Sequence, residues 1–220
     1  MADVYEGGRW TIRSFVSGFS NNAYLVTCRR TAKSVIIDTP AEPHELLQAA
    51  AETEVAAVLI THGHHDHLEG FEAVASRFNA PVGIGDGDLS CLPASPYSRL
   101  GLADDAIITA GDILLRAIET PGHTPGSFSL MLPAESPGAT PHVFTGDTLF
   151  PGGPGRTDSP DAFNTLVASL ERKLLSLPAH TIVLPGHGPS TTVEAALAEY
   201  RTFVTRRTGE EHGDVLWAGD

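Results

Sequence analysis

The chain is dominated by short apolar or alternating runs, the pattern of β-strands that are buried on at least one face. These runs predict strands at 10–16, 23–27, 34–38, 55–61, 82–85, 113–119, 127–132, 142–145 and 181–184. Apolar residues at helical spacing predict helices at 43–51, 68–78, 161–175 and 193–205. Ser159 or Asp161 can cap the third helix, and Pro178 follows soon after its end.

Strands outnumber helices, which favours two sheets packed on each other with helices outside. No low-complexity linker divides the 220 residues, so we expect a single domain over 1–220 with its core at about 10–205. Residues 131–141 predict a hairpin loop, and residues 89–102 an insertion near a site. The polar tail 209–220 is expected to be disordered or to form a thin cover.

Charge and cysteine content narrow the classes of partner. The formal net charge is -13, with 14 Lys and Arg against 27 Asp and Glu. Such a surface disfavours nucleic acid and anionic membranes, because phosphate binding draws on Lys and Arg. We therefore expect a small-molecule substrate.

Cys28 and Cys91 are far apart and form no CxxC pair, which favours two buried, reduced thiols over a disulfide. Neither an export signal nor a membrane span is recognisable, so a cytoplasmic location is expected.

The segment from Thr61 to His67 carries the strongest chemical signal. It reads Thr-His-Gly-His-His-Asp-His, directly after an apolar strand. A turn at the end of this strand would gather His62, His64, Asp66 and His67 around one point. Imidazole and carboxylate are ligands of zinc and similar first-row metals. His65, between the ligands, points the other way on alternation and is left out.

Three later strands run into glycine turns that each present one further ligand. These residues are His123, Asp147 and His187. Together with the first segment they make seven candidates, more than one tetrahedral metal can use. Two metals about 3.5–4 Å apart can share a hydroxide and polarise a carbonyl or phosphoryl oxygen. The sequence therefore predicts a two-metal centre with one bridging carboxylate.

These motifs resemble those of the metallo-β-lactamase superfamily. Its HxHxDH motif is matched by His62, His64, Asp66 and His67, and its later single ligands by His123, Asp147 and His187. The resemblance implies an αββα sandwich in the α/β class, with two mixed sheets face to face and the site at one edge. It also implies one metal at His62, His64 and His123, a second at Asp66, His67 and His187, and Asp147 as the bridge. Zn²⁺ is expected, with Fe or Mn as alternatives.

Other polar residues are assigned more ordinary roles. His44, His142, His180 and His212 are expected on the surface, and Asp86 and Asp88 in a solvated turn rather than a calcium loop. Asp38, at the end of a strand, resembles the family's aspartate that supports the ligand loops.

Within the superfamily, the chain is most similar to glyoxalase II and its short relatives. The segments 22–26, 121–127, 146–150 and 184–189 carry this resemblance, and 155–158 resembles short relatives and persulfide dioxygenases. Asp147 stands where secreted β-lactamases have Cys, and His64 where diiron oxygen reductases have Glu. Few residues follow the last helix, whereas glyoxalase II continues into a region that binds glutathione. We therefore expect thioester or ester hydrolysis rather than a particular glutathione thioester.

The resemblance implies attack by a metal-bridging hydroxide, which Asp66 holds and deprotonates. Arg156 is expected to bind a substrate carboxylate or else to pair with Asp158, and Phe150, Tyr97 and residues 93–96 to line the pocket. Three rivals stay open: a mononuclear iron persulfide dioxygenase using His62, His123 and Asp147, a lactonase or arylesterase, and a non-catalytic metal-binding module.

Overall fold

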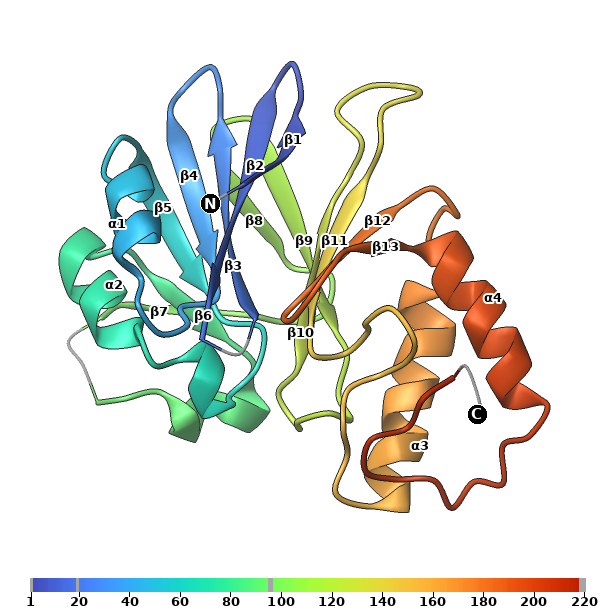
Figure 1. Cartoon of the computed structure of the whole chain (residues 1–220). Helices are drawn as coiled ribbons and strands as arrows, with labels where there is room; N and C mark the ends of the chain where they lie inside the picture. Colours follow the sequence, from blue (N-terminus) through green and yellow to red (C-terminus); the bar gives the residue numbers. More distant parts are fainter. Residues whose placement is uncertain (1, 19, 95–96, 218–220) are drawn as a thin grey trace.

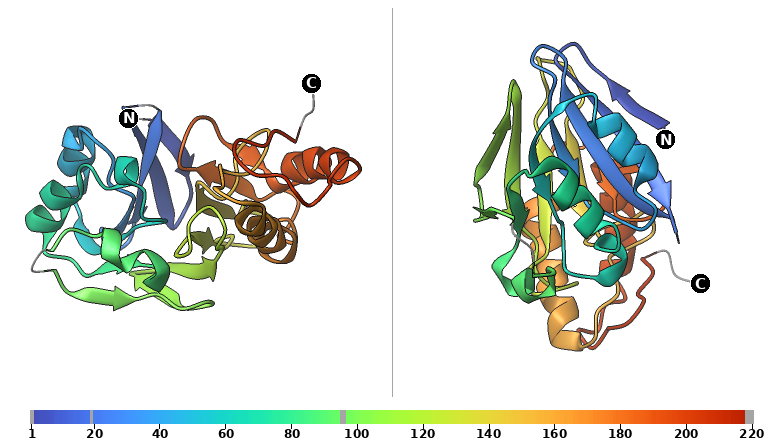
Figure 2. Two further views of the ribbon diagram at one scale, coloured as in Figure 1. Left: turned by 90° about the horizontal axis from the view of Figure 1, so that it is seen from below. Right: turned by 90° about the vertical axis from the view of Figure 1, so that its left-hand side faces the viewer.

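The chain folds into two β-sheets packed face to face, with a pair of helices on each outer side (Figures 1 and 2). The computed structural model describes residues 2–18, 20–94 and 97–217. In this part of the chain the first sheet has the order β1-β2-β3-β4-β5-β6-β7 and the second β13-β12-β11-β10-β9-β8. The predicted αββα sandwich is confirmed.

The first sheet mixes antiparallel and parallel pairing. The pairs β1-β2, β2-β3 and β3-β4 are antiparallel, and the pairs β4-β5, β5-β6 and β6-β7 are parallel. Its strands are β1 (Ala2–Glu6), β2 (Trp10–Ser17), β3 (Asn21–Cys28), β4 (Lys33–Ile37), β5 (Glu54–Leu59), β6 (Val82–Ile84) and β7 (Arg99–Gly101). Helices α1 (His44–Ala50) and α2 (Phe71–Phe78) cover its outer face.

The second sheet is antiparallel except for the pair β11 and β12. Its strands are β8 (Ile107–Ala110), β9 (Ile113–Glu119), β10 (Phe128–Leu132), β11 (His142–Gly146), β12 (Ile182–Pro185) and β13 (Thr191–Thr192). Helices α3 (Pro160–Ser169) and α4 (Val193–Val204) cover its outer face, and α3 continues into a π-helical turn, Leu170–Leu174. No helix in the described ranges is both long and apolar enough to cross a membrane.

Side-chain alternation explains why both faces of each sheet are buried. In β3, Tyr24 and Val26 point into the core between the sheets, whereas Leu25 packs under α1 and α2. In β11, Phe144 lies between the sheets and Val143 lies under α3 and α4. Inner strands such as β3 and β11 thus contribute to two apolar layers, which is why their sequences read as nearly continuous apolar residues.

The predicted strands are all present, but four further strands were missed. These are β1, β7, β8 and β13, which lie at sheet edges and carry a weak alternation signal. The second helix begins at Phe71 rather than 68, because a 3₁₀ turn at His65–His67 precedes it. Ser159, not Asp161, caps α3: its Oγ accepts a hydrogen bond from the Ala162 N–H at 3.2 Å.

The C-terminal tail is an ordered cover as far as it is described. The Trp217 side chain is fully buried, and its ring lies 5.1 Å from that of Tyr200 and 6.3 Å from that of Phe203. The backbone N–H of Trp217 donates to the Gly152 carbonyl at 2.8 Å, and Thr157 and Gly213 exchange two backbone hydrogen bonds. The tail therefore fastens the loop after β11 to α4 (Figure 1). Residues 218–220 of the predicted tail lie outside the described residues.

The expectations for His142 and Cys91 were wrong. His142 is only 3% exposed, because it begins β11 and its ring packs 4.6 Å from the ring of Tyr5. Burial lowers its pKa to about 4. Both cysteines are free as expected, but Cys91 is exposed rather than buried. His44, His180 and His212 are exposed, as predicted.

Replacing Trp217 tests whether the tail belongs to the cooperative fold. We expect Trp217→Ala to lower the free energy of unfolding by about 3–5 kcal/mol, because it leaves a large cavity in the layer under α4. Leu216→Ala, at a neighbouring side chain that is 66% exposed, should stay within about 0.5 kcal/mol of the parent. Urea unfolding measures both; equal stabilities of the two variants would show that the tail is a separate, weakly bound segment.

The lowered pKa of His142 predicts part of the pH dependence of the free energy of unfolding. Its pKa in the folded chain, about 4, lies below the ordinary value of 6.5, so the unfolded chain binds the proton more readily between these values. Its contribution is complete above pH 6.5 and is lost as the pH falls toward 4, by up to about 3 kcal/mol. His142→Gln should lose less stability than the parent between pH 7 and pH 4.5 in urea unfolding. Parallel losses in the two proteins would contradict this assignment.

Candidate metal centre

Seven histidine and aspartate side chains converge at one end of the sandwich. His62 and His64 follow β5, and Asp66 and His67 lie in the 3₁₀ turn that comes next. His123 lies in the loop between β9 and β10, Asp147 follows β11 and His187 follows β12. All seven therefore come from loops at the carboxyl ends of strands in the two sheets, which meet at this edge.

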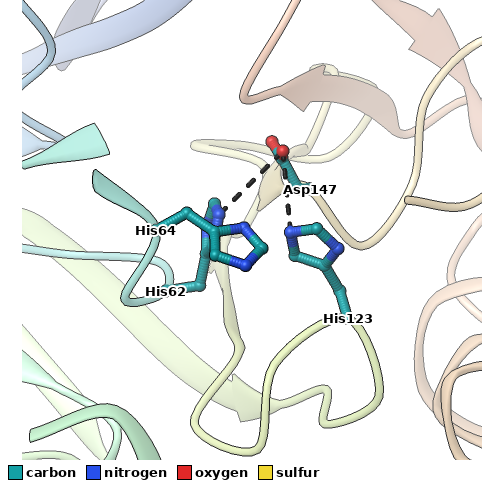
Figure 3. Close-up of side chains that lie close together, drawn as sticks. All are labelled: His62, His64, His123 and Asp147. Atoms are coloured by element: carbon teal, nitrogen blue, oxygen red, sulfur yellow. Dashed lines mark ion pairs between the residues drawn. The ribbon is translucent and has the colours of Figure 1, made fainter. Parts of the chain in front are cut away.

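The side chains form two groups whose ligand atoms lie within 4.8 Å of one another in each group. His62, His64, His123 and Asp147 make the first group, shown in Figure 3. Asp66, His67 and His187 make the second. The structure thus divides the seven residues as the sequence resemblance implied, and their role as metal ligands stays a prediction.

Asp147 lies between the two groups. Its Oδ2 is 3.9 Å from His62 Nε2 and 3.7 Å from His123 Nε2 in the first group. In the second group, Oδ2 is 3.5 Å from His187 Nε2 and Oδ1 is 3.4 Å from His67 Nε2. One carboxylate therefore faces ligand atoms of both groups, the arrangement that a bridging ligand needs.

The second group is closed by Asp66 from the opposite side. Asp66 Oδ2 lies 3.1 Å from His187 Nε2 and 3.7 Å from His67 Nε2, and the two imidazole Nε2 atoms are 3.2 Å apart. Asn21 Nδ2 donates to the same Oδ2 at 2.8 Å. Asn21 thereby orients the carboxylate.

The outer nitrogen of three imidazoles is held by a fixed partner. His67 Nδ1 lies 3.1 Å from Asp38 Oδ2, and His123 Nδ1 lies 2.8 Å from the Arg156 carbonyl oxygen, so both donate outward. His62 Nδ1 lies 3.1 Å from Thr61 Oγ1. A partner on Nδ1 fixes the ring and leaves the Nε2 lone pair free for a metal.

Three inward-facing atoms are placed as metal ligands would be. His62 Nε2, His123 Nε2 and Asp147 Oδ1 are buried without a hydrogen-bond partner among the described residues. Unpaired buried polar atoms are costly, and native proteins rarely leave them so. Nitrogen and carboxylate oxygen together suit zinc, iron or manganese. The donor set and the orphaned atoms thus fit a metal centre.

The charges in the metal-free cluster follow from burial and close pairing. Burial, then the neighbouring imidazole of His67, lowers the pKa of His62 well below its ordinary value. Burial also opposes charge on His67, but Asp147 and Asp38 on its two sides raise its pKa to about 10. Asp147 is buried too, and its contact with His67 still lowers the pKa of its carboxyl. The metal-free chain thus keeps a proton on His67 that metal binding would release.

Two buried aspartates hold the ligand loops from outside. Asp38, proposed from sequence, accepts hydrogen bonds from the Thr61 N–H and the Thr61 hydroxyl, both at 2.8 Å, besides contacting His67. Asp88 was expected in a solvated turn, and this was wrong: it is 3% exposed and bonded to both ligand loops of the first group. Asp86 is exposed and pairs with Arg99, as a solvated turn predicts. Asp88 follows β6 at the same sheet edge as the ligands, a signal that could have identified it.

The start of β3 supports the loop that carries His187. Asn22 Nδ2 donates to the carbonyls of Pro185 and Gly188, and the Tyr24 hydroxyl donates to Pro185 at 2.7 Å. Gly186 packs so closely that a Cβ there would lie 2.3 Å from Asp147 Oδ1. Only glycine permits this approach. Sequence reasoning noted residues 22–26 only as a resemblance and missed this support.

The remaining predicted residues are only partly at the centre. His64, His123, Arg156 and Asp158 line a groove of about 470 Å³ beside the first group. Arg156 Nη2 lies 3.8 Å from Asp158 Oδ1, and both side chains are mostly exposed. The Phe150 ring is 6.2 Å from that of His187, whereas Tyr97 packs edge-on against Phe71, under α2. Residues 95 and 96 of the predicted pocket loop lie outside the described residues, and His65 is exposed.

Comparison with known proteins agrees with this geometry. A model of the metallo-β-lactamase superfamily matches residues 16–187. A probable metallo-hydrolase, YqgX, from Bacillus subtilis is 33% identical over 78% of this chain and 87% of that protein. A probable hydroxyacylglutathione hydrolase, glo2, from Schizosaccharomyces pombe is 34% identical over 76% of this chain, which spans only 64% of that protein.

A solved structure, TTHA1623 in a di-iron-bound form, has a TM-score of 0.67 and 31% identity, over 83% of this chain and 96% of that one. The family model covers most of the chain and contains all seven converging side chains. The chain belongs to the metallo-β-lactamase superfamily.

Proposed function

We propose that the chain is a metal-dependent hydrolase of thioesters or esters that works with two divalent ions. The observation that carries this proposal is the position of Asp147, whose carboxylate faces ligand atoms of both groups. The di-iron form of a 31% identical structure and the metallo-hydrolase name of a 33% identical relative support it. We propose Zn²⁺ as the metal, with iron or manganese as alternatives.

His62, His64 and His123 would hold the first ion, and Asp66, His67 and His187 the second, with Asp147 shared. When bound, two such ions supply a Lewis acid for the substrate carbonyl and water of lowered pKa. The chain contributes the orientation: the outward hydrogen bonds of His67 and His123 hold the rings in place before any ion arrives.

Asp66 is proposed as the proton acceptor. Its carboxylate is half-buried, which opposes ionisation, but the hydrogen bond from Asn21 and the nearby His67 lower its pKa below the ordinary value. It is therefore a carboxylate at neutral pH beside the ligand atoms of His67 and His187, where it would accept the proton of the attacking water. Asn21 fixes the direction of its Oδ2.

The groove beside the first group is proposed to receive the substrate. Two residues of the first group, His64 and His123, line this groove together with Arg156 and Asp158. Because Arg156 has only a long, exposed contact with Asp158, its guanidinium can bind a carboxylate with two hydrogen bonds. A carboxylate-bearing thioester, of which a hydroxyacyl glutathione thioester is one, fits this groove. The name of the fission-yeast relative supports that class.

Asp147→Asn tests the shared ligand. An amide donates hydrogen bonds on one side and carries no charge, so it cannot serve both groups. We expect the parent to bind two metals per chain and the variant at most one, with a loss of activity of about 10²-fold or more. Metal analysis after dialysis, together with hydrolysis of a thioester panel, measures both.

The matched control is Asp105→Asn, an exposed aspartate with a left-handed backbone that asparagine also adopts. This control should keep both metals and full activity. A parent protein with a single iron and oxygen uptake on a persulfide would reject the two-metal hydrolase in favour of a dioxygenase. Full activity on lactones alone would favour a lactonase.

Arg156→Ala tests the carboxylate contact. Loss of an exposed, charge-assisted contact should raise KM for carboxylate-bearing thioesters roughly tenfold and leave kcat nearly unchanged. Neutral thioesters should be hydrolysed as before. Arg201→Ala, which removes an exposed charge on α4, is the control for net charge. Equal effects of Arg156→Ala on charged and neutral substrates would contradict the contact.

A further inference from the structure

Asp88 joins two loops that come from different sheets. It lies in the 3₁₀ segment Asp86–Cys91, which follows β6, and its side chain is buried. Asp88 Oδ2 accepts hydrogen bonds from the Gly63 N–H at 2.8 Å and from the Thr124 hydroxyl at 2.6 Å. Its Oδ1 accepts from the Gly126 N–H at 3.0 Å. One carboxylate thus receives three donors.

These donors sit beside the ligands of the first group. Gly63 is the residue between His62 and His64, and Thr124 directly follows His123. The contacts are close: a Cβ at Gly63 would lie 3.0 Å from the Cβ of Asp88, and one at Gly126 would lie 2.7 Å from its Cγ. The distance between the two loops is therefore set by the Asp88 carboxylate itself.

Asp38 has the corresponding contacts toward the second group. It contacts His67 directly and holds Thr61, at the end of the preceding strand. The hydrogen bonds of Asp88 go instead to the loops of His64 and His123. Asp38 thus reaches His67 directly and His62 through the Thr61 hydroxyl, whereas Asp88 joins the loop of His62 and His64 to the loop of His123.

We infer that Asp88 is a positioning residue for the first metal: it holds the loop of His62 and His64 against the loop of His123 so that their ligand nitrogens converge. This inference rests on the proposed two-metal function. Neutral imidazoles carry no charge, and their edge-to-face ring contacts are too weak by themselves to fix two loops in place. The three hydrogen bonds to one charged acceptor fix them in advance.

The main test compares Asp88→Asn with Asp86→Asn. An asparagine at 88 keeps the shape of the side chain but places an amide NH₂ where one carboxylate oxygen accepted a hydrogen bond, so at least one of the three donors loses its acceptor. Asp86 is the control because it is an exposed residue of the same turn. We expect Asp88→Asn to weaken binding of one metal about 10- to 100-fold and leave the other unchanged. Stoichiometry after dialysis and Co²⁺ titration followed by absorbance should then show one tight metal, against two in Asp86→Asn. Two metals bound as in the parent, or equal weakening of both, would overturn the inference.

A metal-free measurement separates this inference from the proposed function. Without metal, the amides of Gly63 and Gly126 should exchange hydrogen about tenfold faster in Asp88→Asn than in the parent, because they lose a charged acceptor. Unchanged exchange would overturn the inference whatever the metal count. A parent that binds only one metal would overturn the two-metal function, and faster exchange would still support the role of Asp88.

Thr124 provides a second variant if Asp88→Asn does not fold. Thr124→Val removes the hydroxyl that donates to Asp88, and Thr124→Ser keeps it. We expect Thr124→Val to weaken the same metal by several-fold and Thr124→Ser to restore the parent affinity. Equal affinities in the two variants would contradict the role of this hydrogen bond.

Discussion

The centre depends on hydrogen bonds from outside it, which hold buried ligand atoms close together. Among the described residues, His62 Nε2, His123 Nε2 and Asp147 Oδ1 face inward without a hydrogen-bond partner, and burial disfavours a charge on His62. The contacts that hold these atoms in place therefore lie on the outward side of each ligand side chain. Outward hydrogen bonds to Asp38, Thr61 and the Arg156 carbonyl orient the rings, and Asp88 joins the loops. The unfavourable burial of ligand atoms is offset by favourable contacts one layer further out.

The sandwich architecture makes this arrangement available. Ligands from β5 belong to the first sheet and those from β9, β11 and β12 to the second, so the centre lies where the two sheets meet. Each metal group takes residues from both sheets. The stability of the centre is consequently coupled to the packing between the sheets, and the apolar core of Tyr24, Phe128 and Phe144 fixes the distance across which the ligands reach.

The sequence predicts what is encoded locally and misses what depends on partners far along the chain. Nine strands follow from apolar runs, and the convergence of seven His and Asp side chains follows from a dense motif and three glycine turns. The edge strands β1, β7, β8 and β13 are short or partly exposed, so their pattern is weak. Asp88 looks like a turn residue because its partners are 25 to 38 positions away. His142 and Trp217 are likewise buried by neighbours, Tyr5 and Tyr200, that no local pattern connects to them.

The residues of the proposed metal centre and the residues that line the groove beside it are held in different ways. The ligands are fixed by buried hydrogen bonds, whereas the groove beside them is lined by exposed side chains such as Arg156 and Asp158, whose mutual contact is long. Exposed pairs of this kind contribute little to stability, so they can change without loss of the fold. The loop that carries them is held through its backbone by the C-terminal tail, at Thr157 and Gly152. Its side chains can therefore change without moving the loop, because the loop's position does not depend on them.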